Sequence, residues 1–290
     1  MARVDPLADP PGNRVTNGRG KRSRCRSTTT LVEPIDTGMA WVIANRLRGI
    51  RPQAAFLITT LIGYATLVGA LVALGLVLTK ILIPIDAIRH ADEAIPGWMA
   101  DHRSGWLDNA SDIVSRMGDI PALPILVALI LVIAALVRRL RIGAFLLTAV
   151  LMEVTAYRIG ALAVPRQRPD VHRLDTLPVD QSFPSGHVAA SVVVYVGLAL
   201  LVTSHFQRRW VAALTWSLGL TIVFAIALSR IYRGMHHPLD TLSGAALGAG
   251  CLIVAVIAVR VYGSVQRRRD GHPARAVHQK ESRESCGHCP

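Results

Sequence analysis

Residues 238–259 read PLDTLSGAALGAGCLIVAVIAV, an apolar run in which Asp240, near the start, is the only charged residue. A run of roughly 20 apolar residues can cross the hydrocarbon core of a bilayer as a helix. Gly244, Gly248 and Gly250 lie inside the run. Small residues at such spacing let helices approach closely. The run therefore predicts a membrane-spanning helix that packs tightly against its neighbours.

Five further apolar runs precede this one, so the sequence predicts six spans. Helices are expected because lipid offers the backbone no hydrogen-bond partners, and barrel strands would be about half as long and would alternate in polarity. The expected fold class is all-α, a polytopic membrane helix bundle with six transmembrane helices. The five earlier runs cover about 54–79, 121–137, 142–163, 187–204 and 210–228.

The composition supports a membrane protein and excludes several other classes. Of 290 residues, 51% are hydrophobic and 4 are Cys, and the mean hydropathy is +0.40. A disordered chain would lack this apolar content, and a disulfide scaffold would need many more cysteines. The net charge is +13, but 10 of the 32 Lys and Arg lie in residues 1–52 and 7 lie in residues 260–290. A nucleic-acid binder would instead carry its charge along one folded face, so we expect no nucleic-acid partner.

The distribution of charge predicts how the chain sits in the membrane. The N-terminal segment, the C-terminal tail and the loops around 138–141 and 208–209 are basic, which favours the cytoplasmic side. The loop 80–120 has more acidic than basic residues and is expected outside. We therefore expect a multi-pass protein of the cell membrane with both termini in the cytoplasm. Three segments are predicted: a basic, largely disordered segment over 1–52, a six-helix membrane domain over 53–262, and a basic, disordered tail over 263–290.

The acidic loop 80–120 contains a helical pattern of its own. Apolar residues recur at helical spacing between Ile85 and Ile95, and Trp98 and Trp106 follow. An interfacial helix with its tryptophans at the level of the headgroups fits this pattern, and a plain connecting helix fits it equally.

Polar residues gather in two other loops that the topology places on the same outer face. The first reads PRQRPD over 165–170 and FPSGH over 183–187, and the second reads SRIYRGMHHPLD over 229–240. Together they supply at least four Arg and three His. Arginine binds phosphate oxygens in two-point contacts, so the set suits a phosphate group.

The positions of these residues relative to the helix ends strengthen that interpretation. Ser185, Gly186 and His187 lie where the fourth run begins, and a helix N-terminus attracts anions. His236 lies just before the sixth run, and Asp240 lies four residues later. In the first turn of a helix these two could share one side, so that Asp240 holds one imidazole nitrogen and leaves the other free to attack.

These residues resemble the motifs of the type 2 phosphatidic acid phosphatase (PAP2) superfamily, which includes lipid phosphate phosphatases and vanadium haloperoxidases. The family motifs are Lys-x6-Arg-Pro, Pro-Ser-Gly-His and Ser-Arg-x5-His-x3-Asp. The second is complete at 184–187, and the third is complete from Ser229 to Asp240. Of the first, Arg168 and Pro169 are present, but Ala161 stands at the Lys position. The resemblance covers roughly residues 54–260.

The resemblance implies a role for each matching residue. His236 would attack phosphorus and form a phosphohistidine, Asp240 would orient His236, and His187 would protonate the leaving alkoxide and then activate water. The phosphoryl oxygens would be bound by Arg168, Ser185, Gly186 and Arg230. The design requires no metal and no other cofactor, because arginines and helix dipoles supply the positive field.

Ala161 is the one departure from the family pattern. Arg158, about one helical turn earlier, and Arg166 are candidate auxiliary residues that could replace the missing cation. Arg158 could instead pair with a carboxylate such as Glu153. The sequence thus predicts a lipid phosphate phosphatase, with a catalytically weak lipid-phosphate-binding protein as the alternative. A haloperoxidase is disfavoured by the six spans, and a transporter by the absence of paired repeats.

The site lies at the membrane surface, so the expected partners are membrane lipids and a lipid phosphate substrate. Phosphatidic acid, phosphatidylglycerol phosphate and a polyprenyl phosphate or diphosphate all fit, and the sequence leaves the oligomeric state open. Asp170, Asp175 and Asp180 are interpreted as loop carboxylates, without the spacing of a metal loop. Cys286 and Cys289 form a short C-terminal motif that favours an ordinary tail over a metal or redox site.

Overall fold

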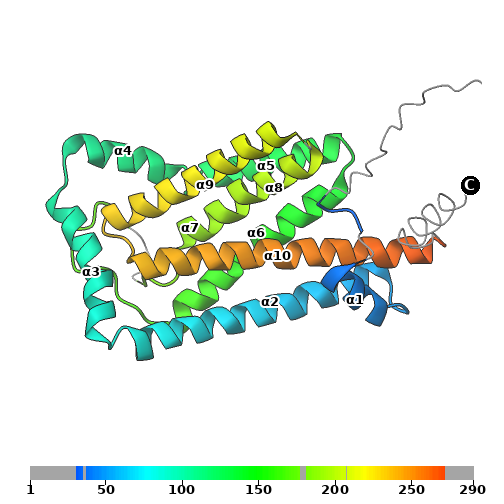
Figure 1. Ribbon diagram of the computed structural model, residues 1–290, viewed down its shortest axis with the longest axis horizontal. Coiled ribbons are helices and arrows are strands. Elements are labelled where there is room, and N and C mark those ends of the chain that lie inside the picture. Colours follow the sequence, from blue (N-terminus) through cyan, green and yellow to red (C-terminus); the bar gives the residue numbers. More distant parts are fainter. Residues whose placement is uncertain (1–30, 35–36, 177–180, 207, 272–290) are drawn as a thin grey trace, which may run out of the picture.

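The computed structural model describes residues 31–34, 37–176, 181–206 and 208–271, and all regular elements in these ranges are helical (Figure 1). Two short segments are π-helical: η1 continues α2, and η2 joins α7 to α8. In chain order the elements are α1 (Gly38–Arg46), α2 (Pro52–Val77), η1 (Leu78–Leu82), α3 (Asp86–Asp101), α4 (Gly105–Arg116), α5 (Ala122–Leu136), α6 (Leu140–Ala163), α7 (Gly186–Ser191), η2 (Val192–Val196), α8 (Gly197–His205), α9 (Arg209–Tyr232) and α10 (Pro238–Arg269).

Five helical stretches among the described residues are long and apolar enough to cross a membrane. Each contains one of the runs predicted from the sequence, which confirms a polytopic all-α bundle. They are Pro52–Leu82, Leu140–Ala163, Gly186–His205, Arg209–Tyr232 and Pro238–Arg269.

The run at 121–137 differs from the prediction of a full-length span. It forms α5, an apolar helix of 15 residues. At 1.5 Å per residue α5 is about 22 Å long, short of the roughly 30 Å of hydrocarbon. The helix ends early because Arg138 takes a left-handed conformation, with φ of 54°, and the chain turns into α6. The structure therefore contains five candidate spans and one shorter apolar helix.

The helix α10 runs along the middle of the bundle and contacts α2, α6 and α7. A Cβ atom on Gly244 would lie 2.3 Å from the carbonyl oxygen of Ser185, and one on Gly248 would lie 2.5 Å from that of Ala189. Gly250 faces α2 at a similarly short distance. Only glycine permits such close approach, so the packing role predicted for these glycines is confirmed.

The buried core joins α6, η2 and α10, with Phe145, Val193 and Leu247 among its most enclosed side chains. The outside of the bundle is also apolar, as exposed Leu162 and Phe224 illustrate. On a water-soluble protein such a surface would associate with another, whereas in a bilayer it is the lipid-facing surface.

The structure corrects two of the predicted segment boundaries. Within the segment 1–52, α1 is an ordered helix, and Ala40 and Ala44 pack against Val261 and Val265 of α10. At the other end α10 continues to Arg269, beyond the boundary predicted at residue 262. The rest of the predicted disordered regions, including Cys286 and Cys289, lies outside the described residues.

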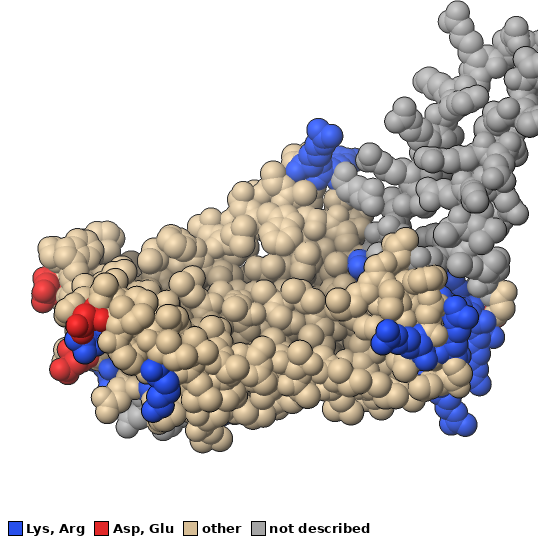
Figure 2. All heavy atoms as spheres, turned by 60° about the horizontal axis from the view of Figure 1, so that its bottom comes forward, with Lys and Arg blue, Asp and Glu red and all other residues tan. Residues whose placement is uncertain are grey.

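The two ends of the bundle carry different charge. On the face that Figure 2 shows, Lys and Arg gather at the end where α1 and the last turns of α10 lie, whereas Asp and Glu appear at the end of α3 and α4.

The acidic loop 80–120, where the sequence predicted a helix, forms the two helices α3 and α4. The exposed Trp98 and Trp106 lie on α3 and α4.

Candidate active site

The motif residues meet at the α3 and α4 end of the bundle. Ser185 and Gly186 stand at the start of α7, and Arg230 lies in the last turn of α9. His236 lies in the turn before α10, and Arg168 lies in the loop after α6. The close packing of α10 against α7 is what brings the second motif beside the third.

His236 is buried, and a single hydrogen bond fixes its ring. Its Nδ1 lies 2.8 Å from the carbonyl oxygen of Ser182. A carbonyl oxygen only accepts hydrogen bonds, so Nδ1 carries the proton and Nε2 keeps its lone pair. Burial, followed by the positive charge of Arg230, holds the pKa of His236 well below its usual 6.5. The imidazole is therefore neutral at physiological pH, as a nucleophile must be.

The carboxylate of Asp240 does not hold His236 in the way the sequence predicted. It accepts hydrogen bonds from Arg166 (2.5 Å), the hydroxyl of Ser182 (2.5 Å) and the backbone N–H of His237 (2.9 Å). His237 is the extended N-cap of α10, with ψ of 160°, so the helical side shared with Asp240 begins one residue after His236. Asp240 reaches His236 only through Ser182, whose hydroxyl and carbonyl contact one residue each.

Arg166 lies beneath the site and not on a phosphate-binding surface. Its guanidinium is buried and donates to Asp240 and to Asp92 of α3. The other oxygen of Asp92 accepts the backbone N–H of Leu239 at 3.0 Å, at the start of α10. Arg166 therefore ties α3 to the first turn of α10, which corrects its prediction as an auxiliary phosphate ligand.

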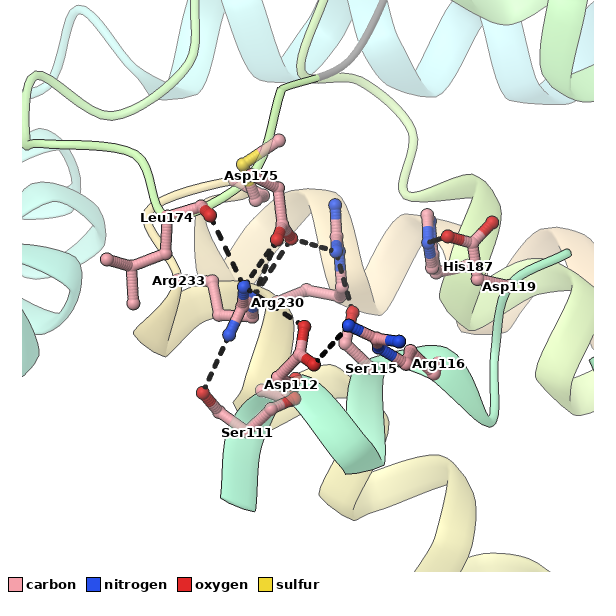
Figure 3. A network of polar contacts seen from close by, with 12 residues as sticks. Ser111, Asp112, Ser115, Arg116, Asp119, Leu174, Asp175, His187, Arg230 and Arg233 are labelled. Atoms are coloured by element: carbon pink, nitrogen blue, oxygen red, sulfur yellow. Dashed lines mark hydrogen bonds and ion pairs between the residues drawn. The ribbon is translucent and has the colours of Figure 1, made fainter. Parts of the chain in front are cut away.

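Arg230 presents hydrogen-bond donors that nothing in the described part of the chain satisfies. Its side chain is buried, and its Nη1 donates to Ser115 and Asp175 at 2.7 Å each (Figure 3). Its Nε and Nη2 have no hydrogen-bond partner there, and neither does the hydroxyl of Ser185. Leaving a buried donor unpaired costs about 1–3 kcal/mol, and more for a charged one. These three atoms belong to two motif residues and suit an anion rich in oxygen.

Asp119, in the turn between α4 and α5, is a neighbour of the site that the sequence did not reveal. Its Oδ2 lies 3.6 Å from Nε2 of His187 (Figure 3). The hydrogen-bonding contact with His187 is the largest influence on this carboxyl group and lowers the pKa of Asp119 to about 2. Asp119 is thus ionised and able to stabilise a protonated His187.

Asp175 is more than the plain loop carboxylate that the sequence suggested, because it joins two arginines. Arg233 contacts it through Nη2 at 2.5 Å and Nε at 2.9 Å, beside the contact to Arg230. Burial alone would raise the pKa of Asp175, but the hydrogen bonds from Arg233 and the charge of Arg230 lower it below the usual value. Arg233 also donates to Ser111 of α4 at 3.2 Å, which fastens α4 to the site.

A cavity of about 530 Å³, here called the histidine cavity, opens from the site. His187, His236, Arg168 and Gly186 line one part of it. Apolar side chains line most of the rest, contributed by α5, α6, α7 and η2. Leu123, Val127, Leu131, Val150, Val154, Ala190, Val193 and Val194 are among them.

The structure places a cation near the site, although none stands at the position of the missing Lys. Ala161 is buried in α6. Arg158, one turn earlier on the same helix, lines the histidine cavity together with Glu153.

Among the described residues, no group of three or more His, Cys, Asp or Glu side chains is arranged to hold a metal ion. Asp180 lies outside the described residues.

The bundle contains helices long enough to span a membrane, and two histidines and a buried arginine lie at the polar end of an apolar cavity. These features are typical of a membrane protein that binds an anionic group. The comparisons with known proteins show what this chain is similar to. Residues 142–263, which include the two complete motifs at 184–187 and 229–240, match the PAP2 superfamily.

Two curated relatives illustrate the similarity. An undecaprenyl-diphosphatase of Sulfolobus acidocaldarius is 33% identical over 112 residues, which cover 39% of this chain and half the length of that relative. Phosphatidylglycerophosphatase B of Bacillus subtilis is 28% identical over 171 residues, which cover 57% of this chain and 82% of the relative.

A solved structure shares the fold. It is described as a transmembrane PAP2 type phosphatidylglycerolphosphate phosphatase from Bacillus subtilis. It superimposes with a TM-score of 0.55 at 23% identity, over 68% of this chain and 92% of the other. This likeness supports the helix bundle as PAP2-like.

Proposed function

We propose that the chain is an integral membrane phosphatase that hydrolyses a lipid phosphomonoester or diphosphate through a phosphohistidine on His236, without a metal ion. The observation that carries the proposal is the set of buried donors on Ser185 and Arg230 that have no hydrogen-bond partner among the described residues. Arg230 lies close enough to His236 for its charge to lower the pKa of the ring, and the carbonyl of Ser182 orients that ring. A phosphoryl group supplies acceptor oxygens for these donors and an electrophile for Nε2.

The shape of the histidine cavity favours a lipid as the substrate. Its polar part holds the histidines, and its apolar part continues between α5 and α6. A hydrocarbon chain there would gain roughly 0.8 kcal/mol for each CH₂ group it buries. The polar part would then receive the phosphate, at the end of the bundle that bears α3 and α4.

In the first step, Nε2 of His236 attacks phosphorus, and the bond between phosphorus and the leaving oxygen breaks. His187, protonated beside Asp119, gives its proton to that oxygen, so the lipid leaves as an alcohol, or as a monophosphate from a diphosphate. Arg168, Arg230, Ser185 and the backbone at Gly186 stabilise the charge that builds on the phosphoryl oxygens.

In the second step, His187, now neutral, takes a proton from water while the oxygen of that water attacks the phosphohistidine. The bond from phosphorus to Nε2 breaks, inorganic phosphate leaves, and both histidines return to their starting forms. Asp240 and Arg166 act by holding Ser182 and the start of α10 in place, which fixes the direction in which Nε2 points.

The proposal includes a topology. α5 would be the sixth crossing, its short length compensated by tilting neighbours or local thinning of the bilayer. The basic end of the bundle would face the cytoplasm, with both termini there and the site outside. The relatives are named for undecaprenyl diphosphate and phosphatidylglycerophosphate, so both remain substrate candidates, beside phosphatidic acid.

The test is phosphate release by the purified protein in detergent, with EDTA, from phosphatidic acid, phosphatidylglycerol phosphate and a polyprenyl diphosphate. Wild type is compared with His236→Ala and with His90→Ala, a change at an exposed histidine of α3. We expect release that survives EDTA, falls by roughly 10³-fold or more in His236→Ala, and is unchanged in His90→Ala. Equal activity in wild type and His236→Ala would overturn the mechanism. Phosphate binding without release from any lipid would favour the alternative, a binding protein that lost catalysis with Ala161.

A further inference from the structure

A second cavity lies at the opposite end of the bundle from the histidines. It measures about 940 Å³ and is here called the basic-end cavity. Its walls come from the start of α2, the turn between α5 and α6, and the last turns of α10. Tyr262, in one wall, is 24 residues along α10 from Pro238, or about 36 Å from the start of the helix. The two cavities therefore serve opposite sides of a bilayer.

Three arginines on one turn give this cavity its positive charge. Arg138, Arg139 and Arg141 all line it. Their guanidinium groups have no hydrogen-bond or ion-pair partner within the described part of the chain. The cavity is also lined by the apolar side chains of Val32, Phe56, Leu57, Leu140, Ile142 and Val259. The three cations therefore border a partly hydrophobic space and not open water alone.

The backbone beneath these arginines shows that the first is kept despite a conformational cost. Arg138 N–H bonds to the carbonyl of Ala135, and Arg139 N–H bonds to that of Ala134 at 2.8 Å. This is a Schellman ending of α5, in which the left-handed position usually belongs to glycine. Arg138 occupies it with φ of 54°. A side chain at this position is unfavourable for the turn itself, and glycine would avoid this cost.

The remaining walls suit a lipid. Phe56, Leu57 and Ile142 supply apolar surface, and the exposure of Leu57 and Leu140 places the opening on the lipid-facing side of the bundle. Glu33 and Asp270 also line the cavity, so three arginines and two carboxylates leave a formal charge of +1. A headgroup with one phosphodiester matches this excess of positive charge.

We propose that the basic-end cavity binds a glycerophospholipid of net charge −1, such as phosphatidylglycerol. Its phosphodiester lies on Arg138, Arg139 and Arg141, and its acyl chains lie against Phe56 and Leu57. Basic pockets between transmembrane helices are suited to anionic headgroups, and arginine binds phosphate oxygens in two-point contacts. This inference does not depend on the proposed phosphatase activity, because it can be tested by measuring lipid binding alone.

Native mass spectrometry of the purified full-length protein tests the proposal. Phosphatidylglycerol or phosphatidylethanolamine is titrated into wild type, Arg139→Gln/Arg141→Gln and the matched control Arg208→Gln/Arg209→Gln. The control removes two exposed arginines that do not line the cavity. We expect wild type and control to retain one phosphatidylglycerol, and the cavity variant to bind it about 30-fold more weakly. Equal affinity in the two variants, or equal retention of phosphatidylethanolamine by wild type, would overturn the proposal.

A second measurement uses only the wild-type chain, so it does not depend on how the variants fold. A phosphatidylglycerol with a photoreactive group in its acyl chain is crosslinked to the protein, and the labelled peptides are mapped. Label on the α2 start and the α5–α6 turn, competed by unlabelled phosphatidylglycerol, supports the site. Label spread evenly over the lipid-facing helices, without competition, contradicts it.

Discussion

At the scale of single residues, the hydrogen bond from His236 to the carbonyl of Ser182 decides which ring nitrogen can react. It assigns the proton to Nδ1 and leaves the lone pair on Nε2, the nucleophile that we propose. The surrounding arginines and the burial of the ring keep it neutral. Of the neighbouring carboxylates, Asp240 forms a hydrogen bond with Ser182 and acts on His236 through its charge, and Asp119 contacts His187.

The lowered pKa of His236 predicts how activity depends on pH. The folded protein protonates His236 only well below pH 6.5, so at pH 6 the nucleophile remains in its reactive, neutral form. The acid limb of kcat/KM, which reports the free enzyme, is therefore expected well below pH 6.5, with activity lost as pH falls through the lowered pKa. A pH series with a short-chain lipid phosphate measures it. A limb at 6.5 or above, unchanged from that of a solvated imidazole, would contradict the assignment.

Asp119→Asn is expected to slow the chemical step and leave substrate binding nearly intact. Asparagine keeps the shape and can still accept the backbone N–H of Ile120, but it removes the negative charge beside His187. Since positioned acid–base catalysis contributes about 10²–10⁴-fold, we expect kcat to fall by about 10–100-fold with little change in KM. Asp101→Asn, at an exposed position of α3, serves as the control. A change in KM alone would mean that Asp119 serves binding and not proton transfer.

At the scale of elements, the active site depends on how closely α10 packs against α7. The carbonyl of Ser185 lies where a side chain on Gly244 would begin. The backbone N–H of Ser185 also bonds to the carbonyl of Asp240 at 3.0 Å, which joins the second motif to the third. Helix packing therefore sets the distance between Ser185 in the second motif and Asp240 in the third.

Gly244→Ala is expected to lower both stability and activity. The new methyl group would meet a backbone oxygen, which cannot turn aside as a flexible side chain can, so α7 must shift. Overpacking of this kind costs about 1–3 kcal/mol. Gly69→Ala in α2 is the matched control, because its methyl group would enter open space. Thermal unfolding in detergent and phosphate release compare the two; equal behaviour would show that the contact is not tight.

The sequence predicted the parts of the site that adjacent residues define, and missed those that distant elements contribute. The motifs at 184–187 and 229–240 could be found because each lies on one short segment at a helix end. Asp92 meets Arg166 across 74 positions, and no local pattern marks it as buried. The predicted pair of Asp240 with His236 was wrong because helical spacing was applied to a residue that still lies in extended backbone.

At the scale of the whole molecule, the two ends of the bundle differ in charge, and each end has its own cavity. The histidine cavity opens at the end of α3 and α4, and the basic-end cavity at the other end, with α10 extending from one to the other. Because Lys and Arg favour the cytoplasmic side, the asymmetry in Figure 2 leads us to expect the histidine cavity on the outer side of the membrane. An even number of crossings places both termini on the same side of the membrane, and an odd number places them on opposite sides.

Cysteine labelling of intact cells tests whether α5 crosses. In a background without the four native cysteines, Ile120→Cys and Arg139→Cys place one exposed thiol at each end of this helix. If α5 spans the bilayer, a membrane-impermeant maleimide should label position 120 from outside and position 139 only after permeabilisation. Asp101→Cys and Arg208→Cys provide the outer and inner references. Labelling of 120 and 139 from the same side would contradict the six-crossing topology, because the two ends of α5 line the two opposite cavities.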